Sequence, residues 1–466
     1  MCAIGLGSEV SIVIVPMTLQ QLAMCTSGTL CGENVQFHGV STDSRQLDKD
    51  DLFVALSGES FNGNQFVEVA KIKGASAALV SEATDSIPSV LVADCRHAFG
   101  LMARENRRQF TGALVAVTGS SGKTSTKEML ASIFSQCGEV FATRGNLNNE
   151  IGVPLSLLAI EKKHRFAVIE MGAAKQGDIA YLCEFAEPDI AILTNAQPAH
   201  IAGFLSLEGV AKTKGEIFRG LPKHGLAVIN ADDTFCEYWQ ENAAHVKQCL
   251  FSLVREDVDV FARDIDLSVP GTVKFELVSF KGKAIVCMPL SGRHMVANAL
   301  AAAAASLSAG VSLSDVVAGL EAMKGVSGRL LRREIAGVAV IDDSYNANPG
   351  SVRAAIDVLA SSEGRKILVM GHMGELGSEA GLRHREIAAY ARENKLDALF
   401  VVGDFASLMA DEFGQQSFAF ANKQEMILMM NVFVKAGDTV LVKGSRSAGM
   451  EDVVDALSSE LLGRNS

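Results

Sequence analysis

Glycine, lysine and threonine follow an apolar run in ALVAVTGSSGKTST, residues 113–126. An apolar strand, a glycine turn and a helix start would direct backbone N–H groups and the positive end of the helix dipole at phosphate oxygens. Lys123 would then contact the β- and γ-phosphates, and the Thr124 hydroxyl would bind Mg²⁺. The usual pattern, G-x-x-x-x-G-K-[ST], has a glycine where this chain has Val117, but that position shapes loop width rather than chemistry. The stretch predicts a nucleotide phosphate site.

Three further stretches place polar residues near the ends of predicted strands. Glu170 ends the apolar run AVIE, where a buried carboxylate needs a partner; Mg²⁺ would supply one, and helix capping is the alternative. His200 follows ILTNA, and its position in series with Glu170 and Thr124 favours a ligand over a structural histidine. The amide-rich TRGNLNNEIGVPLSLL, residues 143–158, fits a capped loop as well as a ligand contact.

The rhythm of apolar runs predicts an α/β protein of three domains. Residues 17–100 carry short mixed elements and predict a small α/β domain, with residues 1–16 as a candidate extension. In 101–328, apolar strands alternate with helices, which predicts a doubly wound, mostly parallel sheet with helices on both faces. In 329–466, four short strands each close on Gly or Asp, which predicts a Rossmann-like domain. Clefts in such sheets lie at the carboxyl ends of strands, where the polar stretches also lie.

Composition excludes several classes of protein. The formal net charge of -12 argues against a nucleic-acid-binding face. Nine cysteines without a C-x-x-C pair indicate a reducing cytoplasm rather than a disulfide scaffold or a zinc site. The N-terminus lacks the basic region of a signal peptide, and the alanine-rich run 298–310 is too short to span a bilayer. We expect a cytoplasmic protein without stable membrane insertion.

Seven stretches together resemble the Mur ligases, the ATP-dependent amide-forming enzymes of peptidoglycan precursor synthesis: TGSSGKTSTKEML, TRGNLNNEIGVP, IEMG, TNAQPAHIAGFLSLEGVAKTKGEIF, HMVANALAAAA, GVSGR and DDSYNANP. The phosphate loop of that family is TG-[ST]-x-GKT-[ST], so Val117 is expected. VSTDSRQLDKDDLFVALSGESFNGNQFV also resembles the family's uridine-nucleotide-binding domain. The resemblance runs from about Met17 to the C-terminus.

Within the family, DDSYNANP and EMGAAKQGDI are similar to the member that joins D-alanyl-D-alanine to UDP-N-acetylmuramoyl-tripeptide. The resemblance implies ATP and Mg²⁺ as cofactors, an acyl-phosphate intermediate, and UDP-N-acetylmuramoyl-pentapeptide as product. We expect a monomer. It also implies that ATP and the uridine substrate close the C-terminal domain onto the central one, because Arg329, Asp343 and Lys123 must converge.

Site residues follow by similarity. The implied catalytic residues are Lys123, His200 and Lys214. Thr124 and Glu170 would bind one Mg²⁺, and His200 a second, supported by Lys214 if it is carbamylated; Lys212 is the alternative in a shifted register. The implied ATP-binding residues are Gly119, Ser120, Ser121, Gly122, Lys123, Thr124, Ser125, Asn298, Arg329, Asp343, Tyr345 and Asn346. The implied substrate-binding residues are Ser41, Thr42, Asp43, Ser44, Arg45, Asn146, Asn149, Glu150, Arg383 and His384.

Several of these assignments have alternatives. Arg45 also fits a surface salt bridge, Arg383 and His384 fit a solvated loop, and His294 is assigned a structural role. The alternative enzymes are the sibling that adds the third amino acid and a folylpolyglutamate-type ligase. The first carries a D-N-P-R type loop that this chain lacks, and the second lacks the N-terminal uridine-nucleotide domain. A GTPase would need an N-K-x-D loop, which is absent from the sequence.

Overall fold

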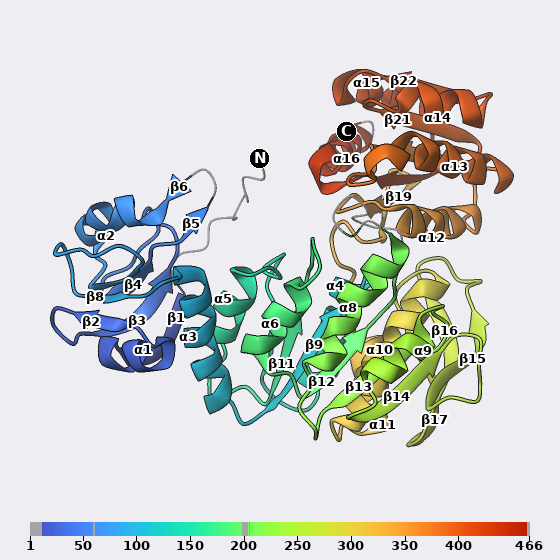
Figure 1. Ribbon diagram of the computed structural model, residues 1–466. Coiled ribbons are helices and arrows are strands. Elements are labelled where there is room, and N and C mark those ends of the chain that lie inside the picture. The colour runs from blue at the N-terminus through green and yellow to red at the C-terminus, as the bar shows by residue number, and fades with distance from the viewer. Residues whose placement is uncertain (1–11, 59–60, 198–203, 205, 464–466) are drawn as a thin grey trace.

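Three large sheets, each with its own helices, and one small two-stranded sheet form the described part of the chain. The computed structural model describes residues 12–58, 61–197, 204 and 206–463. Figure 1 shows the N-terminal domain in blue at the left, the central domain below, and the C-terminal domain in orange and red above it. This architecture confirms the prediction of a three-domain α/β fold.

The N-terminal domain has a six-stranded sheet in the order β1-β3-β4-β7-β8-β2. Its elements are β1 (Ile12–Thr18), α1 (Leu19–Thr26), β2 (Thr29–Cys31), β3 (Gln36–Ser41), β4 (Asp51–Val54), α2 (Val67–Lys73), β7 (Ala77–Val80), β8 (Ser89–Leu91) and the hairpin β5–β6 (Ser57–Gly58, Phe61–Asn62). Residues 12–16, assigned above to an extension, belong to β1 instead. They pair antiparallel with β3, and Ile14 lies in the core of the domain.

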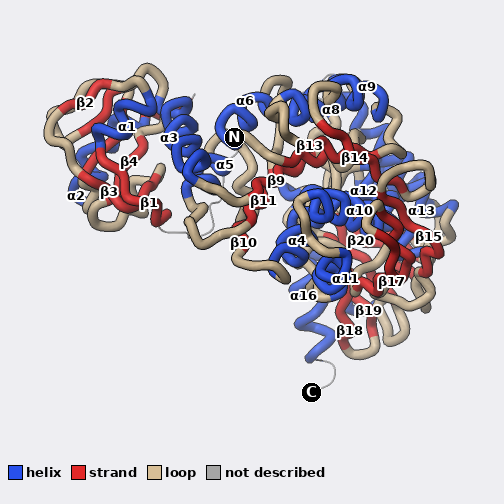
Figure 2. The backbone as a smooth tube through the Cα atoms, turned by 90° about the horizontal axis from the view of Figure 1, so that it is seen from below, coloured by secondary structure: helices blue, strands red, loops and turns tan. Residues whose placement is uncertain are grey.

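The long helix α3 (Cys95–Gln109) joins this domain to the next, so the predicted boundary at residue 100 falls inside a helix. The side-chain Nδ2 of Asn106 in this helix donates to the carbonyls of Leu157 and Ile160 in the central domain, at 2.8 and 3.1 Å. Figure 2 shows α3 beside α5 (Gly152–Leu158). The connection is therefore a packed helix rather than a loose linker.

The central sheet has nine strands in the order β10-β11-β9-β12-β13-β14-β15-β16-β17. All neighbours pair in parallel except β15–β16 and β16–β17, so only β16 runs in the opposite direction. The strands are β9 (Ala113–Thr118), β10 (Val140–Ala142), β11 (Phe166–Glu170), β12 (Ile190–Leu193), β13 (Leu226–Asn230), β14 (Lys247–Ser252), β15 (Val260–Asp266), β16 (Val273–Ser279) and β17 (Gly282–Met288). The remaining helices are α4 (Lys123–Ser135), α6 (Asp178–Ala186), α8 (Leu207–Arg219), α9 (Cys236–Asn242), α10 (Arg293–Ser308) and α11 (Leu313–Glu321).

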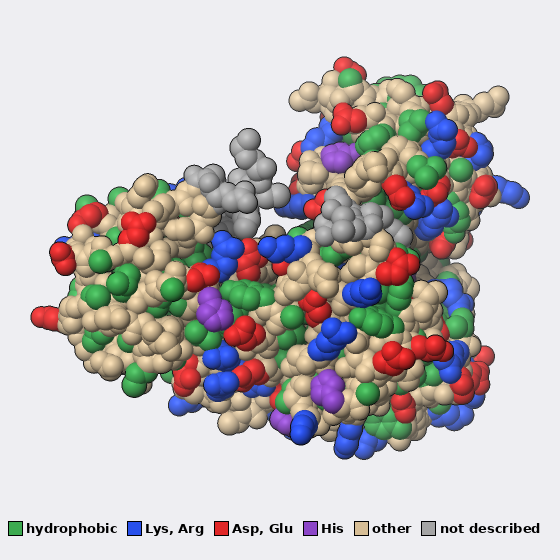
Figure 3. All heavy atoms as spheres, in the orientation of Figure 1, with side chains coloured by type: hydrophobic (Ala, Val, Ile, Leu, Met, Phe, Trp, Pro, Cys, Tyr) green, Lys and Arg blue, Asp and Glu red, His purple; other side chains and the backbone are tan. Residues whose placement is uncertain are grey.

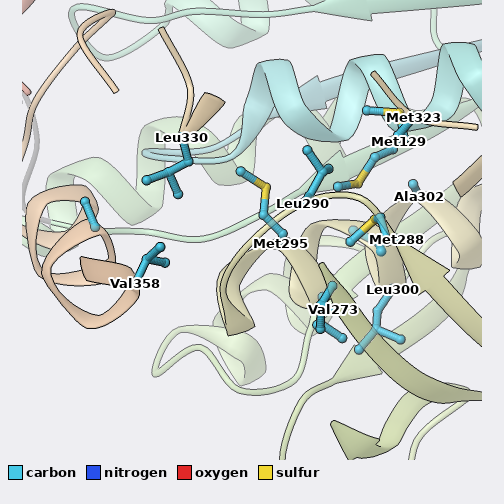
Figure 4. Packing of buried hydrophobic residues seen from close by; sticks show 14 of the residues in the cluster. Met129, Val273, Met288, Leu290, Met295, Leu300, Ala302, Met323, Leu330 and Val358 are labelled. Carbon is cyan, nitrogen blue, oxygen red and sulfur yellow. The ribbon is translucent and has the colours of Figure 1, made fainter. Parts of the chain in front are cut away.

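Strand β9 shows why both faces of this sheet need helices. Val115 and Val117 enter one hydrophobic core and Leu114 and Ala116 another, because alternate side chains of a strand point to opposite faces. Figure 4 shows part of the first core, where Met129 of α4 and Leu300 of α10 lie among other apolar side chains. The alanine-rich α10 is a core helix, and none of the described helices is long and apolar enough to cross a bilayer.

The C-terminal sheet has the order β18-β19-β23-β20-β21-β22, with only β18 antiparallel. Its elements are β18 (Leu331–Ile335), β19 (Val338–Asp343), α12 (Pro349–Ala360), β20 (Lys366–Met370), α13 (Ala380–Glu393), β21 (Ala398–Val402), α14 (Ala406–Phe413), β22 (Ser417–Phe420), α15 (Lys423–Phe433), β23 (Thr439–Lys443) and α16 (Glu451–Gly463). Buried residues of α12 join the core that also contains α4 and α10, so the C-terminal domain packs on the central one.

Candidate active site

A cavity of about 1000 Å³ lies where the central and C-terminal domains meet. Figure 3 shows this face of the molecule hollowed between the N-terminal and C-terminal domains, above the central one. The cavity collects most of the predicted site residues: Ser120, Ser121, Gly122, Lys123, Thr124, Ser125, Asn146, Asn149, Glu150, Glu170, Lys214, Asn298, Arg329, Asp343, Tyr345 and Asn346. Residues far apart in the sequence therefore share one space.

The phosphate loop runs from β9 into α4 and depends on two glycines. Gly119 and Gly122 have φ of 152° and 82°. Residues that carry a side chain rarely adopt the backbone conformation of Gly122. A Cβ on Gly122 would stand 2.3 Å from Asn298 Oδ1, and one on Gly119 would stand 1.8 Å from Thr194 Oγ1. Val117 needs no such freedom, because it still lies inside β9 with its side chain in the core.

Residues after β12 hold this loop in place. The N–H of Ser120 donates to the Asn195 carbonyl and that of Ser121 to Asn195 Oδ1, each at 3.0 Å. Lys123 Nζ donates to the Gly119 carbonyl at 2.8 Å, and burial lowers the pKa of Lys123. Asn195 was missed in the sequence, although it lies in the TNAQ stretch after a predicted strand.

Thr124 and Glu170 form the candidate metal site. Thr124 Oγ1 donates to Glu170 Oε2 at 2.8 Å, and Asn148 Nδ2 donates to Glu170 Oε1 at 2.8 Å. Glu170 is only 3% exposed, so its carboxylate lies in a place where a nearby cation is needed. A hydroxyl and a carboxylate are the hard oxygen ligands that Mg²⁺ takes beside substrate phosphates. These residues therefore fit the metal.

The second predicted metal site is only partly described. His200 lies outside the described residues, and the described residues contain no group of three or more His, Cys, Asp or Glu side chains placed to hold an ion. Lys214 of α8 is 1% exposed, whereas Lys212 is exposed to solvent. Among the described residues, Lys214 Nζ has no hydrogen-bond or ion-pair partner, and it lies 5.8 Å from the centre of the Phe204 ring. Burial and, less strongly, the charge of Lys123 hold the pKa of Lys214 well below its usual value.

The C-terminal domain reaches the phosphate loop through two side chains. Arg329 Nη2 donates to Thr124 Oγ1 at 2.8 Å, and Asn348 Nδ2 donates to Ser121 Oγ at 3.2 Å. Asn348 also caps α12, whose first residue is Pro349. The two domains are thus already in contact at the loop in this structure, and closure driven by ligands stays a prediction.

Two cavity residues of the later chain were not predicted to lie there. Lys443, at the end of β23, forms a 2.5 Å ion pair with Asp343; burial raises the pKa of Asp343, and Lys443 opposes that shift. His294, assigned a structural role from the sequence, lines the cavity near the start of α10. Burial, with a smaller effect of Lys443, lowers the pKa of His294 to about 4, so its imidazole is neutral.

The amide-rich stretch before α5 both lines the cavity and caps a helix, and its contact with a ligand stays a prediction. Asn146, Asn149 and Glu150 line the cavity. Asn149 Oδ1 also accepts from the N–H of Gly152 at 2.8 Å, which supports the start of α5. Asn148, which contacts Glu170, was missed, although it lies between two predicted residues.

The predicted uridine-binding residues Ser41, Thr42, Asp43, Ser44 and Arg45 lie on the N-terminal domain and do not line the cavity. The Arg45 side chain is 83% exposed and pairs with Asp43 at 2.6 Å. That hydrogen-bonded guanidinium lowers the pKa of Asp43. The structure therefore contains the surface salt bridge that the sequence offered as the alternative for Arg45.

Arg383 and His384 are not brought to the cavity either. Arg383 pairs with Glu379, the residue just before its own helix, at 2.8 Å and with Glu386 on that helix at 3.0 Å. His384 is 0% exposed: its Nε2 accepts from the Met373 N–H at 2.8 Å, and its Nδ1 donates to the Ala380 carbonyl at 2.7 Å. These contacts support a structural role for His384 rather than the solvated loop or the substrate contact.

Three family models match the chain along most of its length. They are "Mur ligase family, catalytic domain" over residues 36–110, "Mur ligase middle domain" over 117–306, and "Mur ligase, glutamate ligase domain" over 328–446. Each match falls largely within one of the three structural domains.

Curated and solved relatives agree with these matches. The chain is 44% identical over 448 residues to the UDP-N-acetylmuramoyl-tripeptide–D-alanyl-D-alanine ligase of Escherichia coli, covering 95% of this chain and 99% of that protein. A crystal structure of MurF from Acinetobacter baumannii superposes with a TM-score of 0.91 at 37% identity, covering 96% of this chain and 100% of that one. The MurF ligase of Thermotoga maritima, solved in complex with ADP, has a TM-score of 0.83 at 30% identity, covering 91% and 98%.

Proposed function

This chain belongs to the Mur ligase family, and from that premise we propose that it joins D-alanyl-D-alanine to UDP-N-acetylmuramoyl-tripeptide with hydrolysis of ATP to ADP and phosphate. One observation carries the choice of substrates: the 44% identity to an enzyme of that name extends over 95% of the chain. The product is UDP-N-acetylmuramoyl-pentapeptide for peptidoglycan.

The chemistry proceeds in two steps. A terminal carboxylate oxygen of the tripeptide attacks the γ-phosphorus of ATP, the bond to the β,γ-bridging oxygen breaks, and ADP leaves behind an acyl phosphate. The amine of D-alanyl-D-alanine then attacks the acyl carbon, the bond to the phosphate oxygen breaks, and the nitrogen loses a proton. The physical problem of the first step is that a carboxylate must approach a triphosphate.

Side chains of two domains address this crowding of negative charge. Lys123 and Arg329 bring two cations to the cavity, one from each domain, and charges preorganised in a buried site stabilise a transition state without reorganising. Asn298 borders the phosphate loop at Gly122, and we propose from the family resemblance that it contacts the adenine. Thr124 and Glu170 would hold Mg²⁺, which neutralises and orients the phosphates when bound. His200 stays the proposed ligand of a second ion.

Lys214 is proposed to carry a carbamate that supports this second ion. Carbamylation needs a neutral amine, and the lowered pKa of Lys214 supplies one. The neutral nitrogen would attack the carbon of CO₂ and release a proton, which turns an uncharged amine into a carbamate anion. Because Lys123 is close enough to disfavour an ammonium at this position, its charge would favour the anion.

The two alternative ligases fit less well. The family match over residues 36–110 supports an N-terminal uridine-nucleotide domain, which a folylpolyglutamate-type ligase would not need. A sibling that adds the third amino acid would carry a D-N-P-R type loop, which the sequence lacks. We further propose a monomer, and the free cysteines among the described residues fit a cytoplasmic location.

Release of phosphate tests this assignment. ATP and Mg²⁺ are supplied with UDP-N-acetylmuramoyl-tripeptide and D-alanyl-D-alanine, singly and then together, and turnover is expected only with both. Turnover with a single amino acid and a dipeptide-stage precursor would move the chain to the sibling ligase. Small-angle scattering in the presence of ATP and the uridine substrate tests whether the C-terminal domain closes onto the central one. An unchanged radius of gyration would contradict that closure.

A further inference from the structure

Lys443 is a buried lysine that has no role in the proposed chemistry. It ends β23 and is only 2% exposed. Its Nζ donates to Asp343 Oδ2 at 2.5 Å and to the Asn346 carbonyl at 2.8 Å. Asp343 and Lys443 are neighbours in the parallel pair β19–β23. One ammonium therefore ties together both ends of the loop 343–346.

Three contacts join that loop to Arg329 and to the residues on either side of it. The N–H of Leu330 donates to Asp343 Oδ1 at 3.2 Å, and the N–H of Tyr345 donates to the Gly328 carbonyl at 3.1 Å. The Arg329 guanidinium lies 4.2 Å from the centre of the Tyr345 ring, a distance at which a cation is attracted to an aromatic face. Both the backbone around Arg329 and its side chain thus rest on residues 343–345.

Arg329 also connects the C-terminal domain to the central one. Its hydrogen bond to Thr124 reaches the first turn of α4, where Thr124 in turn contacts Glu170. A displacement of the 343–346 loop would carry Arg329 away from the phosphate loop. Lys443 itself contacts none of the phosphate-loop residues through a hydrogen bond or an ion pair in the described structure.

We propose that Lys443 is a positioning residue for the ligase reaction: it clamps residues 343–346 and thereby holds Arg329 against the phosphate loop. The proposal rests on the proposed function for the reaction it serves. A cation is required because Asp343 lines a cavity that must admit a triphosphate and a carboxylate, and an unneutralised carboxylate there would repel both. An ammonium neutralises Asp343 and donates to the Asn346 carbonyl at the same time.

The test combines Lys443→Met with Arg329→Met in a double-mutant cycle. We expect Lys443→Met to lower kcat on the order of 100-fold, the size of effect that a misplaced reacting group produces. In the Arg329→Met background, Lys443→Met should cost less than about threefold more, because residues that act through one another are not additive. Lys435→Met makes the same change at an exposed residue just before the opposite end of β23 and serves as the control.

Hydrogen–deuterium exchange gives a readout that needs no turnover. Lys443→Met should speed exchange at the amides of Leu330 and Tyr345, and Lys435→Met should not. Unchanged exchange, an unchanged kcat, or losses that multiply in the double variant would each overturn the proposal. If Lys443→Met fails to fold, Asp343→Asn/Lys443→Met leaves no unpaired buried charge and takes its place. A wild-type enzyme that is silent with both substrates would contradict the proposed function, while the exchange result would still decide this inference.

Discussion

Replacing Lys214 with methionine should stabilise the protein and abolish its activity. Lys214 is fully buried without a hydrogen-bond or ion-pair partner among the described residues, and its pKa lies well below the usual value because of burial. In the unfolded chain the same amine has a pKa of about 10.4. The unfolded state therefore binds a proton that the native state does not bind, and the free energy of unfolding rises with pH from the folded pKa up to about 10.4.

The size of the effect follows from this linkage. Each unit by which burial lowers the pKa costs about 1.4 kcal/mol of stability below the folded pKa. Methionine fills a similar volume without that cost, so Lys214→Met should gain at least about 1.4 kcal/mol at pH 7.5 in buffer free of CO₂. For a domain of about 200 residues, that gain raises the melting temperature by roughly 3–6 °C.

Thermal unfolding and phosphate release are measured with and without bicarbonate. Bicarbonate should activate and stabilise the wild-type enzyme, since a modification that occurs only in the native state shifts the folding equilibrium, and it should leave Lys214→Met inactive. Lys212→Met, at an exposed position on the same helix, is the matched control. A melting temperature of Lys214→Met several degrees below wild type would refute the reasoning, as would wild-type activity that is independent of bicarbonate.

Three further substitutions test other parts of the site. Glu170→Gln removes the carboxylate that contacts Thr124 and should weaken Mn²⁺ binding by at least about tenfold, measured by paramagnetic resonance; unchanged affinity would place the ion elsewhere. Gly122→Ala puts a Cβ 2.3 Å from Asn298 Oδ1 and should weaken ADP binding about tenfold or more by calorimetry, as strain of this kind costs about 1–3 kcal/mol. His384→Ala should cost roughly 2–4 kcal/mol in urea unfolding, because the buried ring and both its hydrogen bonds are lost, while KM for D-alanyl-D-alanine stays within about twofold; a large rise in KM would restore its substrate role.

Residues close together in the sequence were the predictable part of the site. The loop 119–124 can be recognised in the sequence because the turn, the helix start and the phosphate-binding groups form one continuous segment. Glu170 could be placed because it ends an apolar strand parallel to β9, and parallel strands expose their carboxyl ends at the same edge. Lys443 also ends such a strand, and that signal could have identified it. His294 gave no comparable signal, since its place at the cavity depends on how α10 approaches the phosphate loop.

By itself the sequence determined the three-domain α/β architecture, the phosphate loop and the family, because apolar periodicity and contiguous motifs are local properties of a chain. Only the tertiary structure decided which polar residues meet. It placed Lys214 rather than Lys212 at the cavity, buried His384 away from it, and paired Lys443 with Asp343 and Arg329 with Thr124. These outcomes depend on the packing of separate sheets and helices, and burial and long-range contact set the charge and aim of each side chain.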